Sequence, residues 1–173
     1  GTIVECNEPF ADLMGSSVEN LLGFNTRENA SVPAVRDALA DALRGRQTEF
    51  EGEYTSTSGG KTSYLRIVFN PVNPERIPTE VIATVEDITA RKQAEEELQK
   101  LSSAVEQSQV SVVITDLQGT IEYVNPKFTE VSGYGAKEAI GQNPRLLKAD
   151  IQPTEFYKDM WDTILAGNVW QGE

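Results

Sequence analysis

Three stretches in the first half of the chain have hydrophobic and polar patterns typical of β-strands. In residues 48–57, glutamates alternate with aromatic residues and glycine, a period of two that is typical of a half-buried strand. The alternation returns at residues 65–69, and a third stretch, at 81–88, is rich in valine and isoleucine. A Gly-Gly turn at 58–61 and a loop from Pro71 to Pro78 separate these runs. The pattern therefore predicts three antiparallel strands.

Two other stretches place apolar residues three or four positions apart, which is the spacing of one helix face. They end at Gly45 and Gly167, and glycine is a common helix stop. Helices beside a small antiparallel sheet predict an α+β fold with the helices on one face. We interpret most of the apolar side chains in both stretches as core: Val35, Ala38, Leu39, Ala42 and Leu43 in the first, and Phe156, Tyr157, Met160, Trp161, Ile164 and Leu165 in the second.

One pattern occurs twice in the chain. The tripeptide Gly1-Thr2-Ile3 returns at residues 119–121, and the same spacing matches further asparagine, phenylalanine and glycine positions. Asn7 and Asn125 both stand where a side chain can cap a short helix. Matching of several residue types in one register indicates two copies of one fold. We expect a first domain at residues 1–89, a helical linker at 90–107 and a second domain at 108–173.

The linker differs in composition from the rest of the chain, because residues 91–101 are rich in Lys, Arg, Glu, Gln and Leu. Ala94, Leu98, Leu101 and Val105 step by four, three and four positions, which is the a/d seam of a short two-stranded coiled coil. An exposed apolar seam favours a partner helix. Two arrangements stay open at this point: a helix that dimerises, and a single amphipathic helix that lies on its own domain.

Charge restricts the partners of the chain. Its 15 basic and 27 acidic residues give a formal charge of −12, which disfavours binding to nucleic acid and to an anionic membrane surface. No apolar run reaches the roughly 20 residues of a membrane span. The single cysteine, Cys6, fits a reducing compartment. We therefore expect a cytoplasmic segment without direct membrane contact, and a membrane anchor elsewhere in the parent protein stays compatible with it.

The chain contains no histidine, and this absence excludes several kinds of site. A histidine-ligated haem cannot form, and neither can a Ser-His-Asp or Cys-His catalytic group. One cysteine without histidine leaves no zinc site of the usual kind. A glycine-rich nucleotide-binding motif is missing as well. We expect no haem, no metal and no catalytic residue, so that any kinase or cyclase activity would belong to another domain.

Three motifs carry a family resemblance: residues 119–128 (GTIEYVNPKF), residues 132–134 (SGY), and Asp87-Ile88-Thr89 followed by Arg91-Lys92. Together they resemble tandem PAS domains of bacterial signal-transduction proteins over essentially the whole chain. The resemblance implies a PAS-like antiparallel sheet in two copies and a sensory module that relays to an output domain of histidine kinase or diguanylate cyclase type in the same polypeptide. The homodimer that we expect rests on the linker seam alone. Asp87 and Thr89 would relay the signal, and as possible helix caps they also have a purely structural explanation.

The second copy is similar to the flavin-binding PAS domains of aerotaxis receptors and of redox-responsive nitrogen-fixation regulators. The similarity rests on residues 141–147 (GQNPRLL), on Trp161 and Gly167, and on residues 170–172 (WQG). It implies FAD or FMN bound by Asn143, Arg145, Leu147, Trp161 and Trp170. An amide suits the ring edge, a guanidinium suits a phosphate and an indole packs on a ring. Plain core packing of Trp161 and a solvated Arg145 are the alternative.

The first copy lacks both tryptophans, so we expect it to be empty or to hold an unknown small ligand. Pro144 stands where light-sensing relatives of this fold carry their adduct-forming cysteine, so thiol photochemistry is not expected. Three functions stay open: a relay module, an FAD-dependent redox or oxygen sensor, and a dimerisation scaffold without a ligand.

The resemblance also implies that the first copy lacks its first strand and that the second copy lacks its last three strands. Each sheet would then expose an unpaired backbone edge. We expect the chain to be a segment of a longer protein. The alternative is that residues 112–116 fill a gap by strand swapping.

Overall fold

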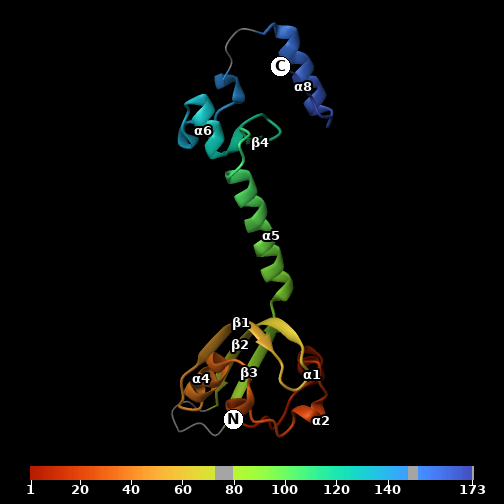
Figure 1. Cartoon of the computed structure of the whole chain (residues 1–173), viewed down its shortest axis with the longest axis vertical. Helices are drawn as coiled ribbons and strands as arrows, with labels where there is room; N and C mark the ends of the chain where they lie inside the picture. Colours follow the sequence, from red (N-terminus) through yellow and green to blue (C-terminus); the bar gives the residue numbers. More distant parts are fainter. Residues whose placement is uncertain (73–79, 148–151, 173) are drawn as a thin grey trace. The chain divides into compact units, whose positions relative to one another are not determined.

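The computed structural model describes residues 1–72, 80–147 and 152–172, and it divides into two compact units, Gly1–Glu96 and Glu97–Glu173 (Figure 1). Each unit combines helices with antiparallel strands. The predicted α+β class is therefore confirmed. Most of the predicted loop from Pro71 to Pro78 lies outside the described residues. None of the helices in the described parts of the chain combines the length and the apolar composition of a membrane span.

The first unit begins with short helices whose ends are capped by side chains. The Asn7 side chain accepts a hydrogen bond from the backbone of Phe10 at 3.1 Å, as predicted for a cap at this position. Gly15 ends the first helix in the left-handed conformation at φ 65°, which favours glycine. The helices are α1 (Glu8–Met14), α2 (Val18–Leu21), α3 (Thr26–Asn29) and α4 (Pro33–Ala42).

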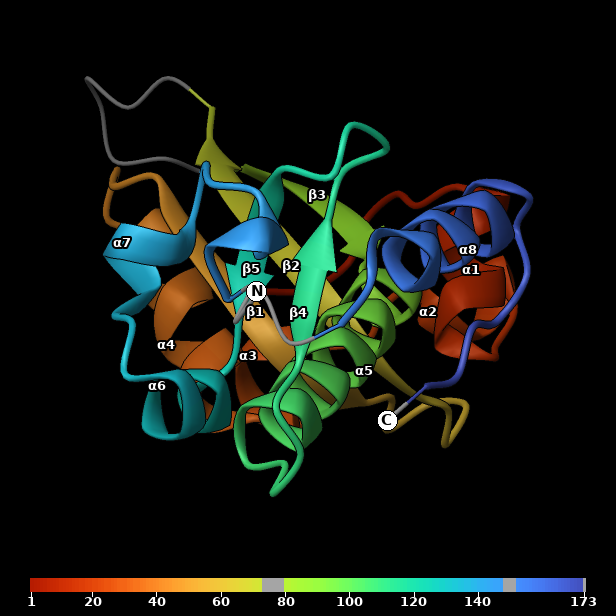
Figure 2. The ribbon, with the colours of Figure 1, turned by 90° about the horizontal axis from the view of Figure 1, so that it is seen from above.

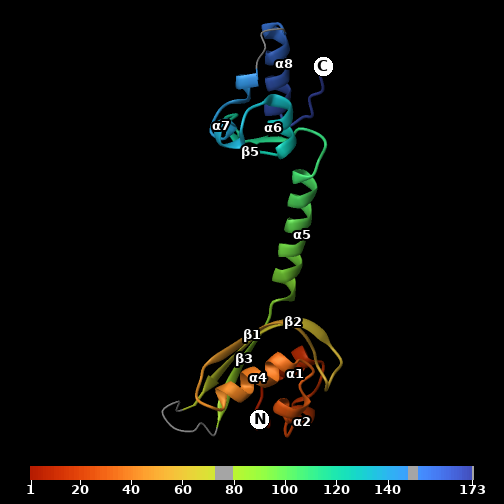
Figure 3. The ribbon, with the colours of Figure 1, turned by 60° about the vertical axis from the view of Figure 1, so that its left-hand side comes forward.

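The three predicted strands of the first unit are confirmed as β1 (Thr48–Thr55), β2 (Thr62–Pro71) and β3 (Val81–Asp87). They pair antiparallel in the order β1-β2-β3. Helix α4 packs against β1 and β2, and Figure 3 shows α1 and α4 on one face of the curved sheet. The buried core includes Val35 and Leu39 of α4 and Leu65 of β2.

One long helix, α5 (Thr89–Glu106), follows β3 directly and covers the predicted linker. Within the described residues, none of its side chains is buried. Leu98 and Leu101 of the predicted seam are 68% and 59% exposed. Burial of apolar side chains therefore does not hold this helix in place, and the polar groups near its ends become important.

The second unit contains a two-stranded sheet, in which β4 (Val113–Thr115) pairs antiparallel with β5 (Ile121–Val124) (Figure 2). In this structure the segment considered for strand swapping thus pairs with β5. A small core forms from Ile121, Val124, Phe128 and Ala139. The helical elements are α6 (Pro126–Ser132), α7 (Ala136–Ala139), the 3-10 helix η1 (Pro144–Leu147) and α8 (Thr154–Leu165).

The second predicted apolar stretch forms α8, but its interpretation as core is wrong. No described residue of α8 is buried, and Ile164 and Leu165 are 45% and 66% exposed. In the first unit, by contrast, α4 buries Val35, Leu39 and Ala42. The physical difference is the sheet, because α4 packs on strands of eight and ten residues whereas β4 and β5 have three and four.

Candidate functional site

The junction between β3 and α5 is held by the two residues predicted to relay a signal. The backbone N–H of Thr89 donates to Asp87 Oδ1 at 2.9 Å, so the Asp87 carboxylate satisfies a free N–H at the helix start. Between these residues Ile88 is 2% exposed. The junction therefore combines a polar cap with one buried apolar anchor.

The same junction is bonded to the neighbouring strand β2. The backbone N–H of Tyr64 donates to Thr89 Oγ1 at 2.9 Å, and the backbone N–H of Ile88 donates to the Tyr64 carbonyl at 2.9 Å. The N–H and the carbonyl of Tyr64 are therefore both hydrogen-bonded to residues at the start of α5. Because the strand pairing ends at Leu65 opposite Asp87, these two bonds extend it into α5.

Ion pairs connect the first turn of α5 to β1. The Lys92 ammonium lies 2.8 Å from Glu51 Oε1, and the Arg91 guanidinium lies 3.4 Å from Glu51 Oε2. Both cations also lie within 3.6 Å of Glu95. The hydrogen bond and charge of Lys92 lower the pKa of Glu51. These groups are partly exposed, so salt weakens the pairs.

Sequence reasoning missed Glu51 as part of this junction. Alternation in β1 places Glu51 on the outer face of the strand, which explains why it meets the helix and not the core. The signal available in the sequence was the pair Arg91-Lys92 directly after Asp87-Ile88-Thr89. Two adjacent cations at a helix start oppose the helix dipole unless acidic side chains lie nearby.

Three of the predicted flavin-binding residues meet around Gly119 in the second unit. Asn143 Nδ2 donates to the Gly119 carbonyl at 2.9 Å, and Asn143 Oδ1 accepts from the backbone N–H and from Nε of Arg145, both at 3.1 Å. A Cβ atom on Gly119 would lie 3.0 Å from the Trp161 ring. Gly119 therefore allows the close approach of Asn143 and Trp161.

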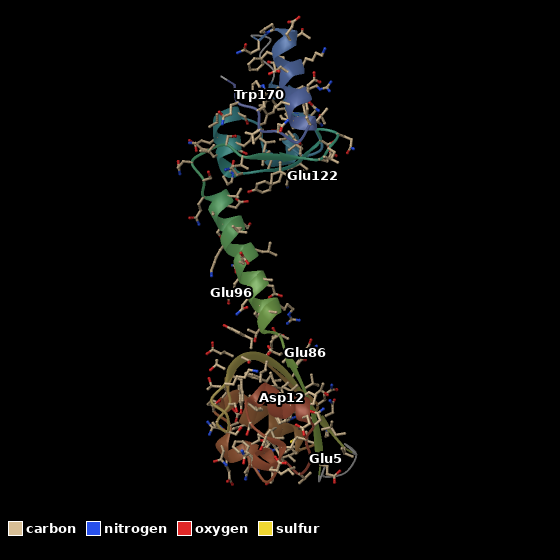
Figure 4. All side chains as sticks on the ribbon, turned by 90° about the vertical axis from the view of Figure 1, so that its right-hand side faces the viewer. Glu5, Asp12, Glu86, Glu96, Glu122 and Trp170 are labelled. Atoms are coloured by element: carbon tan, nitrogen blue, oxygen red, sulfur yellow. The ribbon has the colours of Figure 1, made fainter. Side chains whose placement is uncertain are left out.

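The other two predicted residues have different surroundings. Trp170 packs edge-on against Phe156, with ring centroids 4.9 Å apart at 89°, and its Nε1 donates to Asp159 at 3.0 Å. Figure 4 labels Trp170 beside α8. Leu147 is 44% exposed at the end of η1. The structure thus brings together Asn143, Arg145 and Trp161, while Trp170 packs on residues of α8.

The donor groups around Gly119 fit a flavin in part. Asn143 keeps a second amide N–H, whereas its Oδ1 already accepts two bonds from Arg145. The Arg145 side chain is exposed, so the rest of its guanidinium can meet a phosphate. No group of three or more potential metal ligands occurs in the described parts of the chain.

A hollow of about 530 Å³ lies on the surface of the first unit. Arginine and aspartate side chains dominate its walls, so it differs from the apolar slot that a flavin ring requires. Arg44 and Arg46 both pair with Asp41, at 2.9 and 2.6 Å. The residues that line the hollow are Arg27, Pro33, Arg36, Asp37, Ala40, Asp41 and Arg44.

Comparison with known families accounts for both units. A family described as PAS fold matches residues 1–93, which is more than half of the chain. The chain belongs to the PAS family. A second PAS fold family matches residues 99–173. Two PAS matches along one chain confirm the predicted tandem arrangement of PAS sensory domains.

The relatives of this PAS chain are signalling proteins. It is 41% identical over 69 residues to a nitrogen fixation regulatory protein of Klebsiella pneumoniae, covering 40% of the chain and 14% of that protein. It is 38% identical over 58 residues to the aerotaxis receptor of Escherichia coli, covering 34% and 12%. Hybrid signal transduction histidine kinase L of Dictyostelium discoideum is 27% identical over 145 residues, covering 75% and 8%. The chain thus spans a small part of each relative.

The cap at Asp87 predicts a pH dependence of the start of α5. Hydrogen bonds from the Thr89 hydroxyl and from its backbone N–H lower the pKa of Asp87 below the ordinary 3.8. A lowered pKa in the folded state means that the stabilisation is present above pH 3.8 and is lost as the pH falls through the folded value. We expect an NMR titration to show the Asp87 carboxyl protonating below pH 3.8.

Asp87→Asn keeps an oxygen that can accept from Thr89 but removes the titrating group. This variant should abolish the acid-dependent loss of protection in the first turn of α5, measured by amide exchange. Glu86→Gln, at the neighbouring position of β3, is the matched control and should keep the wild-type dependence. An Asp87 carboxyl that titrates at or above 3.8 would contradict the cap.

Proposed function

We propose that the chain is a PAS sensory module that passes a conformational change through α5 to an output domain of histidine kinase or diguanylate cyclase type in the same polypeptide. The observation that supports this most is the bonding of Thr89 and Ile88 to both backbone groups of Tyr64. A displacement of β2 must either move the helix start or break these bonds. A relative that is named a hybrid histidine kinase supports the type of output.

The energies favour the hydrogen bonds at Thr89 over the ion pairs at Glu51 as the coupling element. A neutral hydrogen bond stabilises by about 1 kcal/mol, and an unsatisfied buried N–H costs about 1–3 kcal/mol. An exposed ion pair contributes about 0–1 kcal/mol, less in salt. Coupling of about 1.4 kcal/mol shifts an equilibrium roughly tenfold, which is a common size for regulation.

Charge supports the proposed partners, and the single cysteine, Cys6, supports a reducing compartment. The chain carries a formal charge of −12, and acidic side chains occur in both units and in α5, as Asp12, Glu86, Glu96 and Glu122 in Figure 4 illustrate. We propose a cytoplasmic segment that binds neither nucleic acid nor a membrane surface. Kinase or cyclase activity is assigned to the output domain.

Thr89→Val tests the relay because it keeps the side-chain shape and removes the acceptor for Tyr64. With the chain fused to a histidine kinase core, we expect autophosphorylation to change roughly fivefold, the equivalent of about 1 kcal/mol. Thr89→Ser keeps the hydroxyl and should behave as wild type. Amide exchange at Tyr64 reports whether the bond is gone. Faster Tyr64 exchange without any change in kinase activity would disprove the relay.

We further propose that α5 pairs with α5 of a second copy. Leu98 and Leu101 are exposed and lie on one seam with Ala94 and Val105, and a seam of this kind is buried when two helices pair. Dimerisation would place two relay helices side by side.

Leu98→Gln combined with Leu101→Gln should convert the chain to a monomer, as measured by analytical ultracentrifugation. Lys100→Gln introduces the same side chain off the seam, so this control should remain dimeric. A wild-type chain that sediments as a monomer at high micromolar concentration would contradict the pairing. A double variant that loses kinase output while Thr89→Val keeps it would favour the dimerisation scaffold over the relay.

The second candidate function is flavin-based redox or oxygen sensing by the second unit. Its support is the approach of Asn143, Arg145 and Trp161 around Gly119, together with relatives that are named aerotaxis receptor and nitrogen fixation regulatory protein. When bound, a flavin would supply the redox chemistry. Asn143 would hold the ring edge and Arg145 a phosphate, while the first unit would stay empty or hold a small ligand.

FAD added to the purified chain should bind with quenching of flavin fluorescence. Asn143→Ala should weaken binding, since an amide that contacts the ring edge is lost. Asn25→Ala, at the repeat-related position of the first unit, is the control and should leave binding unchanged. A chain that is colourless and fails to bind FAD or FMN would eliminate this function.

A further inference from the structure

A buried amide lies where α5 meets the second unit. Asn125 is 1% exposed. Its Nδ2 donates to the carbonyls of Val105 at 3.1 Å and Val110 at 2.9 Å, and its Oδ1 accepts from the backbone N–H groups of Val112 at 2.9 Å and Phe128 at 3.0 Å. The two N–H groups and two lone pairs of the amide are all used.

These four bonds join three segments of the chain. Val105 belongs to the last turn of α5, Val110 and Val112 lead into β4, and Phe128 lies in the first turn of α6. The backbone N–H of Asn125 also donates to the Val112 carbonyl at 3.1 Å. Displacement of the helix end would leave buried polar groups without partners, which is costly in an apolar surrounding. The end of α5 is therefore coupled to the core of the second unit.

Asn7 shows what capping alone requires. It occupies the same position of the repeat in the first unit, and its side chain is exposed. There the side chain accepts from Phe10, and it makes no other hydrogen bond to a described residue. Asn7 caps its helix while exposed and with a single hydrogen bond. Capping therefore does not require the burial of Asn125 or its two donor bonds, which must have another role.

A second contact holds the same end of the helix. The Tyr123 hydroxyl of β5 donates to Glu106 Oε1 at 2.6 Å, and Glu106 is the last residue of α5. This bond is exposed, so it is the weaker of the two attachments.

We propose that Asn125 is the positioning residue that anchors the C-terminal end of α5 to the second PAS unit. Through its hydrogen bonds, a movement of the helix end displaces the segment that leads into β4 and the start of α6. The proposal rests on the relay function above, in which the Thr89 junction holds the opposite end of the helix. The repeat predicted a capping role for Asn125, and its contacts give it this second role.

Asn125→Ser separates the two roles, because a serine hydroxyl still caps Phe128 but cannot donate to Val105 and Val110. We expect amide hydrogen exchange of residues 103–112 in the whole chain to accelerate roughly tenfold, with a smaller change in α6. Asn7→Ser makes the same replacement in the first unit and should leave residues 103–112 unchanged. Unchanged exchange there in Asn125→Ser would overturn the anchor.

If Asn125→Ser unfolds the second unit, amide exchange of the wild-type chain in urea tests the anchor instead. With rising urea, the amides of residues 103–107 should then open together with those of β5, since the anchor makes them one cooperative segment. Opening of 103–107 well before β5 would overturn the proposal. The experiment distinguishes failure of the anchor from failure of the relay. If Asn125→Ser accelerates the exchange of residues 103–112 but leaves the output of the fused kinase unchanged, the relay is contradicted and the anchor is not.

Discussion

The hydrogen bond from the Tyr64 backbone N–H to the Thr89 hydroxyl ties the start of helix α5 to strand β2. Helix α5 buries no described side chain, so apolar packing cannot set its position. Its first turn is instead bonded to β2 through Thr89 and Ile88, and its last turn is bonded to the second unit through Asn125. Each end of the helix is therefore held by polar contacts within the unit to which that end belongs.

Sequence patterns predicted what depends on local periodicity and local caps. Alternation located β1, β2 and β3, and helical spacing located α4 and its core residues. The caps at Asn7 and Asn125 followed from the repeat. The apolar spacing of α8 was misjudged as core, because periodicity shows which residues share a face and says nothing about the surface that the face meets.

Periodicity and local motifs do not predict contacts between segments that are distant in the sequence. The pairing of Glu51 with Lys92 requires the register that brings β1 beside the start of α5. The anchor at Asn125 requires the helix end, the entry to β4 and the start of α6 to converge on one amide. The structure brings Asn143, Arg145 and Trp161 together around Gly119. Trp170 packs on Phe156 instead, a contact that motif spacing does not predict.

Amide exchange along α5 of the Leu98→Gln/Leu101→Gln chain shows whether both ends of the helix are anchored. A helix without attachments frays at its ends, so its middle exchanges most slowly. If both ends are anchored as described, residues 92–94 and 103–107 will exchange more slowly than residues 97–101. Fastest exchange at the two ends, with protection only in the middle, would mean that the ends of α5 are not anchored.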